Sequence, residues 1–89
     1  TQRYNSRRAI NMFNDYFGKE QYEKYHDIVA AALSGRTVSK AIADANYFGG
    51  LIYEANKLNM DMWDLLACLE GMCYNGEARE IDDSTYLIF

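Results

Sequence analysis

Proline is missing from this chain of 89 residues, so no predicted helix has an obligatory break. The sequence also lacks the run of about 18 apolar residues that a membrane-spanning helix requires. Its first five residues are polar and do not form the apolar core of a signal peptide. These absences favour a helical protein of the cytoplasm that makes no contact with a membrane.

Histidine occurs once, which removes most metal sites from consideration. Glu23 and His26 form one Glu-x-x-His unit, but a carboxylate-bridged di-iron site needs two such units. Most zinc sites would need a second histidine as well. The glycine pair at 49 and 50 has neither the dinucleotide-binding nor the Walker spacing. We therefore expect no cofactor, no metal and no enzymatic activity.

Cysteine occurs twice, as Cys68 and Cys73, inside one predicted helix. A spacing of five residues separates the two side chains by about 7.5 Å along the helix axis and by about 140° around it. That geometry does not suit a disulfide bond. We expect two reduced, partly buried thiols, the usual state in a cytosolic protein.

What the chain does have is abundant apolar side chains, 49% of its residues, and they recur at intervals of three and four. This pattern predicts an all-α fold and one domain over residues 1–89. The domain would be a compact bundle of about four helices with an extended apolar C-terminal tail. The expected helices span about residues 6–17, 19–34, 37–58 and 60–74. Gly18, Gly35 and Asn75-Gly76 supply the turns that end three of them.

The third segment contains Gly49-Gly50 near its middle. Two glycines inside a helix each cost about 1 kcal/mol relative to alanine, so two shorter helices around a turn are the alternative. Leu51, Ile52 and Ala55 keep the helical phase of the apolar residues before them. We therefore expect one continuous helix, and the alternative stays open.

The densest stretch, residues 58–76, holds the only tryptophan, both cysteines and three of the four methionines. With Asn59 as the N-cap, Trp63 takes the second position of a hydrophobic staple, so we expect its side chain to be largely buried. Most of the stretch is predicted to be core. Its remaining edge, formed by Met60, Met62 and Trp63, is the predicted surface for another protein.

The sequence closes on four large apolar residues, Tyr86, Leu87, Ile88 and Phe89, after the acidic pair at 82 and 83. An exposed β-prone run of this kind would promote strand pairing and aggregation. We expect the run to be ordered against its own chain or against a second copy. Tyr86 and Phe89 are its predicted partner contacts.

Charge is unevenly distributed along the chain. Residues 1–40 carry seven Lys or Arg and four Asp or Glu, a net +3, whereas residues 41–89 carry two and nine, a net −7. Such asymmetry fits a charged partner, a head-to-tail dimer or plain solvated faces. A chain that is −4 in total is disadvantaged in binding DNA, because phosphate neutralisation supplies most of that affinity.

Residues 36–46 nevertheless allow a second interpretation. Their Thr-Val-Ser-Lys sequence is similar in outline to the recognition segment of a helix-turn-helix protein. Basic and hydroxyl side chains there and near the N-terminus could reach phosphates or bases. The residues of this alternative nucleic-acid site are Arg7, Arg8, Arg36, Ser39 and Lys40.

Together these features predict a small non-enzymatic module that binds another protein and regulates or inhibits it, of the kind that phages and mobile elements encode. Its expected apolar surface exceeds what four short helices bury, which predicts a homodimer or larger homo-oligomer. A DNA-binding transcriptional regulator is the alternative, with nucleic acid the less favoured partner.

Overall fold

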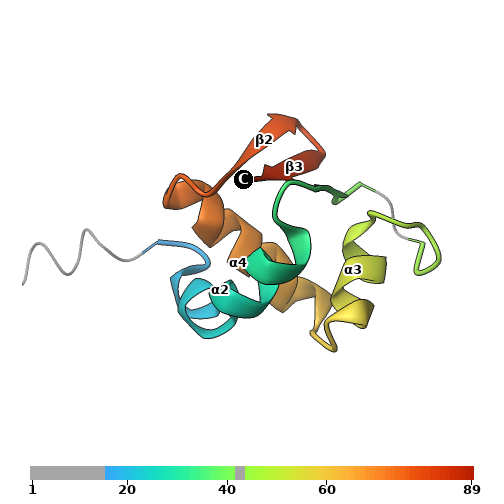
Figure 1. The fold of residues 1–89 in the computed structure, drawn as a ribbon, viewed down its shortest axis with the longest axis horizontal. Helices are drawn as coiled ribbons and strands as arrows, with labels where there is room; N and C mark the ends of the chain where they lie inside the picture. Colours follow the sequence, from blue (N-terminus) through green and yellow to red (C-terminus); the bar gives the residue numbers. More distant parts are fainter. Residues whose placement is uncertain (1–15, 42–43) are drawn as a thin grey trace, which may run out of the picture.

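The computed structural model describes residues 16–41 and 44–89. The described elements (Figure 1) are α2 Lys19–Leu33, β1 Thr37–Ser39, α3 Leu51–Lys57, α4 Met62–Tyr74, β2 Ala78–Asp82 and β3 Thr85–Ile88. The predicted all-α bundle of four helices is therefore wrong, because three described helices are combined with an antiparallel sheet. The first predicted helix, residues 6–17, lies outside the described residues except for its last two positions.

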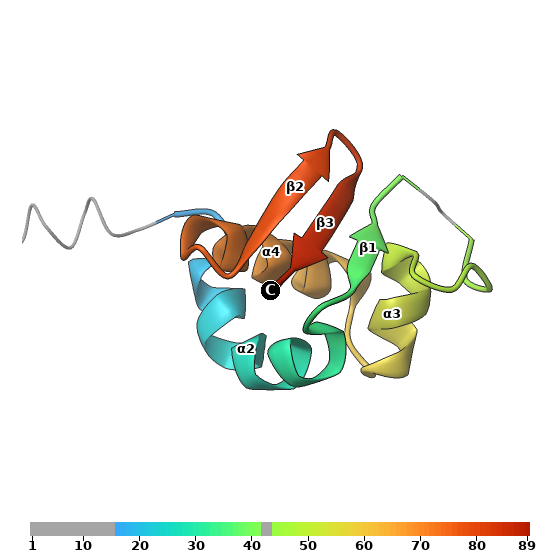
Figure 2. The same ribbon diagram turned by 45° about the horizontal axis from the view of Figure 1, so that its top comes forward.

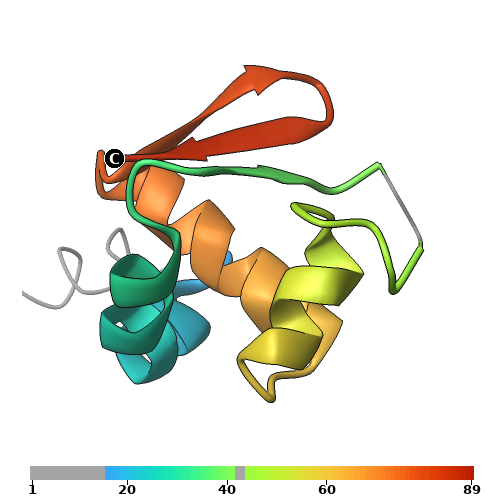
Figure 3. The same cartoon turned by 45° about the vertical axis from the view of Figure 1, so that its right-hand side comes forward.

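The strand β3 lies in the middle of the sheet, between β1 and β2, and both pairings are antiparallel (Figure 2). Val38 of β1 pairs with Tyr86 of β3, while Arg79 of β2 pairs with Leu87. The sheet forms one layer and the helices lie along one of its faces (Figure 3). Alternate residues of β3 consequently point into the core and away from it, whereas β2 is exposed from Arg79 to Asp82.

This alternation explains the apolar run at the end of the sequence. Tyr86 and Ile88 are 0% and 1% exposed, whereas Leu87 between them is half-buried and Phe89 is 58% exposed. The expectation that the run is ordered is confirmed, and of the two alternatives left open, it is the run's own chain that orders it. It is ordered as the central strand of a sheet, however, and not as a tail packed on a helical bundle.

The third predicted helix, residues 37–58, is wrong over most of its length. Its first residues form β1, because Val38 is fully buried and the β-branched side chains of Thr37 and Val38 suit a strand paired with β3. Gly49 has a φ of 86°, a left-handed conformation that interrupts a helix. Gly50 is the N-cap of α3, so the glycine pair precedes a helix instead of lying within one.

The second and fourth predicted helices are confirmed to within about two residues, as α2 and α4. Gly35 and Gly76 adopt φ values of 77° and 78°, as their predicted role in ending helices requires. Gly18, with a φ of 88°, is the N-cap of α2, and most of the helix that it was predicted to end lies outside the described residues. No described helix is both long and apolar enough to cross a membrane.

The helix α4 lies at the centre of the molecule and packs against α2, α3 and the sheet. Its approach to α2 is close because Gly18 meets it directly: a Cβ there would lie 2.0 Å from the carbonyl oxygen of Ala67. Any side chain at Gly18 would therefore push the two helices apart. The core consists of Val29, Leu33, Val38, Leu51, Ala55, Leu65, Cys68, Leu69, Met72, Ala78, Tyr86 and Ile88.

Candidate functional site

The first turn of α4 places Trp63 in solvent. Its relative exposure is 65%, so the prediction that it is largely buried is wrong. The reason is the position of the cap: Asp61, not Asn59, caps the helix, and its carboxylate accepts a hydrogen bond of 3.0 Å from the Trp63 N–H. Because the helix starts two residues later than the predicted staple requires, Trp63 is its second residue and faces outward.

Trp63 begins a row of exposed and half-buried side chains along α4. Steps of three and four residues bring Leu66, Glu70 and Tyr74 to the same side of the helix. Tyr74 is 59% exposed, while Leu66 and Glu70 are half-buried. We call these four residues the α4 stripe. The stripe has a large exposed aromatic residue at each end, separated by about 16 Å of helix rise.

Met60 and Met62, the other predicted contacts beside Trp63, are half-buried and pack in part against the core. Methionine side chains are flexible and adapt to different partner surfaces. Two carboxylates accompany them: Asp61 is exposed and Asp64 is half-buried. The surface around Trp63 is thus apolar with a negative border.

A polar pocket of about 200 Å³ adjoins this surface between α2 and α4. Tyr25 of α2 donates a hydrogen bond to Asp64 of α4 across it, with 3.4 Å between the oxygens. The pocket is lined by Glu20, Gln21, Lys24, Tyr25 and Asp64. Since two carboxylates face one lysine there, the pocket adds to the negative border near Trp63.

Tyr86, a predicted partner contact, is fully buried and has no surface to offer. Its hydroxyl donates a hydrogen bond to Glu70, while the Lys40 Nζ lies 3.4 Å from the same hydroxyl and 2.6 Å from a carboxylate oxygen of Glu80. Burial, followed by the bond to Glu70, raises the pKa of Tyr86, and the bond to Glu80 raises that of Lys40. The cluster ties α4 to the sheet and fixes Glu70 in the stripe.

The predicted nucleic-acid site is not assembled as a recognition helix. Ser39 lies in β1, and its N–H donates to the carbonyl oxygen of Gly49 at 2.7 Å. Arg36 and Lys40 both form ion pairs, with Glu54 at 2.8 Å and with Glu80 at 2.6 Å. Arg7 and Arg8 lie outside the described residues. The described basic residues of that site are therefore engaged by carboxylates of the same chain.

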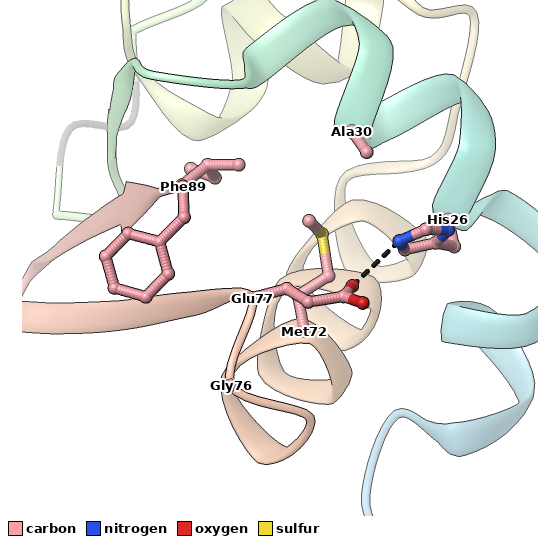
Figure 4. Close-up of a pocket in the computed structure, with 7 residues that line it drawn as sticks. His26, Ala30, Met72, Gly76, Glu77 and Phe89 are labelled. Atoms are coloured by element: carbon pink, nitrogen blue, oxygen red, sulfur yellow. Dashed lines mark ion pairs between the residues drawn. The ribbon is translucent and has the colours of Figure 1, made fainter.

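A second pocket, of about 260 Å³, lies where α2, the end of α4 and β3 meet (Figure 4). Its walls are mostly apolar, and the ion pair of His26 with Glu77 lies at one side (Figure 4). Phe89, the predicted contact that is 58% exposed, forms part of the opposite wall. The lining residues are His26, Ala30, Met72, Gly76, Glu77, Ile88 and Phe89. Sequence patterns did not indicate this pocket, because its walls come from segments far apart in the chain.

Both ring nitrogens of His26 contact carboxylates. Nε2 lies 2.7 Å from Glu77 and Nδ1 lies 3.1 Å from Asp27, whereas the sequence suggested Glu23 as the neighbour. The hydrogen bond to Asp27 and the charge of Glu77 raise the pKa of His26. Tyr22 also donates to Glu77 at 3.0 Å, and burial with this bond raises the Tyr22 pKa to about 12. A ring with both nitrogens engaged by carboxylates is poorly suited to act as a general base.

The two thiols are unpaired, as the sequence predicted; Cys68 is buried and Cys73 is half-buried. Burial raises the pKa of Cys68 to about 12 and also raises that of Cys73. Thiols with raised pKa values supply little nucleophilic thiolate at neutral pH.

Within the part of the chain that the structure describes, no three His, Cys, Asp or Glu side chains are grouped as a metal site. Comparisons with family models, with curated proteins and with solved structures found no match to this chain in any of the three. The chemistry of its own surface is therefore the basis for a functional proposal.

Proposed function

We propose that this chain is a small non-enzymatic module that binds another protein through Trp63, Met60 and Met62 and thereby regulates or inhibits it. The observation that carries the proposal is the 65% exposure of the only tryptophan, which follows two half-buried methionines in the chain. Tryptophan is the residue type most enriched among those that dominate binding energy at protein interfaces. An exposed tryptophan in the rigid first turn of a helix is already oriented for such a contact.

The charge around Trp63 defines the complementary surface. Asp61 and Asp64 flank it, and residues 41–89 carry a net charge of −7. A partner with an apolar pocket and basic residues at its border would complement this surface and bind it faster at low salt. The same charge disfavours nucleic acid, whose phosphates it would repel.

The environments of the single histidine and of the two cysteines favour a binding role over nucleophilic catalysis. His26 has both ring nitrogens against carboxylates, and raised pKa values keep Cys68 and Cys73 protonated. We also propose a cytoplasmic location, because two unpaired thiols are typical of a reducing compartment.

Capture from a lysate of the native host tests the binding site. Trp63→Ser should lose the bound protein, whereas Phe48→Ser, which removes an aromatic side chain that is 76% exposed elsewhere on the surface, should retain it. The purified partner should then shift the Trp63 emission to shorter wavelength, because binding would remove the indole from water. Equal capture by both variants, with no emission shift, would place the binding surface elsewhere.

Self-association is a further part of the proposal. Eight large apolar side chains are at least 47% exposed among the described residues, and contact with a second copy would remove part of this surface from water. They are Phe17, Ile28, Tyr47, Phe48, Trp63, Tyr74, Ile81 and Phe89. Sedimentation equilibrium at tens of micromolar should show a homo-oligomer, and a stable monomer there would contradict it.

A further inference from the structure

The walls of the pocket beside His26 are held in place by hydrogen bonds and by the core (Figure 4). The N–H of Phe89 donates to the carbonyl oxygen of Glu77 at 3.0 Å, and the Ser34 hydroxyl donates to the carbonyl oxygen of Phe89 at 2.6 Å. Met72, which is 1% exposed, belongs to the core cluster. The pocket is therefore formed by the fold itself, as most small-molecule sites are.

The turn that ends α4 places Glu77 at the side of this pocket. Gly76 has a φ of 78°, and the Glu77 N–H donates to the carbonyl oxygen of Met72 at 2.8 Å. The Gly76 N–H donates to the carbonyl oxygen of Cys73 at 3.1 Å. These two bonds form a Schellman motif, the usual helix ending around a left-handed glycine. The Glu77 side chain consequently extends from a fixed backbone position.

The two carboxylate oxygens of Glu77 differ in their surroundings. The Tyr22 hydroxyl donates to Oε1 at 3.0 Å, and the Nε2 of His26 lies 2.7 Å from the same oxygen. No described side chain forms a hydrogen bond or ion pair with Oε2, and the side chain of Glu77 is 41% exposed. The carboxylate therefore retains an acceptor that a bound molecule can use.

The titratable groups at the pocket favour a cationic ligand. None of the seven described residues that line it is a lysine or an arginine. Glu77 and the neighbouring Asp27 supply two carboxylates beside the single imidazole of His26. The sum of these three charges is negative whether or not the ring carries a second proton. A positively charged group is thus the electrostatic complement of this site.

The volume of the pocket, about 260 Å³, limits the size of the ligand. An apolar cavity of about 150 Å³ holds one benzene molecule, so this pocket has room for one aromatic ring and a short arm. We propose that it binds a small arylalkyl ammonium ion, with the ring against Ala30, Met72 and Phe89 and the ammonium group on the Oε2 of Glu77. This site lies at the opposite end of α4 from Trp63 and is independent of the proposed function.

Titration of the isotope-labelled full chain with phenethylammonium, followed by NMR, tests the site. The probe should bind with a dissociation constant of about 1 mM, an ordinary affinity for so small a molecule. Nuclear Overhauser effects should connect its ring to the methyl groups of Ala30 and Met72. Phenethyl alcohol, which has the same shape without the charge, should bind more weakly, and phenylpropionate should bind most weakly.

Two variants separate the apolar part of the site from its charge. Ala30→Leu fills the pocket and should abolish binding, whereas Phe48→Ala changes a distant exposed ring and should leave it unchanged. Glu77→Gln should weaken phenethylammonium binding about fivefold, the effect of a partly exposed ion pair, and should remove the preference over the alcohol. The amide spectrum of each variant shows whether it is folded.

Three results would each overturn the proposal, and the first two need only the unaltered chain. One is the absence of Overhauser effects to Ala30 and Met72 at probe concentrations well above 1 mM, including the case in which the probe contacts only the polar pocket beside Asp64. Another is equal affinity for the cation, the alcohol and the carboxylate. The third is undiminished binding to a folded Ala30→Leu variant. None of these results bears on capture of a protein through Trp63.

Discussion

Neighbouring helices α3 and α4 reverse the usual distribution of polar and apolar side chains. On α3, the carboxylate of Glu54 is only 1% exposed, whereas on α4 the indole of Trp63 is 65% exposed. Charged side chains are almost never fully buried without partners, and large aromatic ones are usually buried in small domains. The difference shows that two local factors determine burial here more than residue type does. One is the set of partners around a side chain, and the other is the residue at which the helix begins.

Glu54 tolerates burial because three donors surround it. Arg36 Nη2 lies 2.8 Å from its Oε2, the Gly49 N–H donates to the same oxygen at 3.2 Å, and Lys57 Nζ lies 3.9 Å from Oε1. A buried carboxylate with such partners offsets much of its desolvation cost. The contacts also join α3 to the chain on both sides of β1. Trp63 has one backbone bond to Asp61 and no comparable packing.

The largest expected effect separates the two sides of α4. Leu69→Ala should lower the free energy of unfolding by about 2 to 5 kcal/mol, because Leu69 is fully buried and the change leaves a cavity. Trp63→Ala, on the exposed side, should lower it by less than about 1 kcal/mol. Urea denaturation of both variants measures the difference. A loss at Trp63 as large as that at Leu69 would mean that the indole is part of the core.

A smaller effect is expected from neutralising the buried carboxylate. Glu54→Gln weakens the bonds to Arg36 and Gly49 and should cost about 1.5 to 3 kcal/mol, the range for hydrogen bonds to charged groups. Arg36 keeps access to water, with its side chain 42% exposed, which limits the loss. Glu80→Gln removes the more exposed pair with Lys40 and should cost at most about 1 kcal/mol. Equal decreases in the free energy of unfolding for the two variants would show that burial does not strengthen the interactions of Glu54.

Local signals in the sequence predicted the elements whose formation depends on nearby residues. Gly18 and Gly35 bracket α2, and Asn75-Gly76 ends α4, because left-handed turns after helices are encoded within a few positions. The order of the apolar run at residues 86–89 could also be predicted, since four large apolar side chains rarely stay in water.

Pairing between distant segments could not be predicted in this way. Residues 37–39 precede apolar residues at helical spacing, which favoured a helix. The strand that pairs with them, however, lies 46 to 50 residues later in the chain. Burial of Val38 opposite Tyr86 in this pairing overrides the local helical pattern. The pocket beside His26 has the same origin. The burial of Trp63 was predicted wrongly for a more local reason. Asn59 and Asp61 are both good N-cap residues, and the hydrophobic-staple pattern favoured Asn59, whereas Asp61 caps the helix.

The smallest expected effect concerns His26, whose side chain is 30% exposed and thus lies between the two extremes. Its pKa is raised above 6.5 by the bond to Asp27 and by the charge of Glu77. A histidine whose pKa is higher in the folded state contributes stability that is fully present below the unfolded value and is lost as pH rises through the folded value. The free energy of unfolding should therefore decline as pH rises from about 6.5 through neutrality.

Titration by NMR measures this directly, because the chain has one histidine and its ring protons are unambiguous. The pKa of His26 should lie above 6.5, Glu77→Gln should lower it, and His26→Gln should flatten the decline in urea midpoints between pH 6 and 8. Asp27, whose side chain is fully exposed, provides the comparison. Screening by water should make Asp27→Asn the weaker of the two carboxylate variants, although its bond to the ring is the larger contribution to the raised pKa. A larger decrease in the His26 pKa for Asp27→Asn than for Glu77→Gln would show that hydrogen bonding outweighs burial at this site. The conclusion that burial strengthens a carboxylate's interactions, drawn from Glu54, would then hold only for fully buried carboxylates.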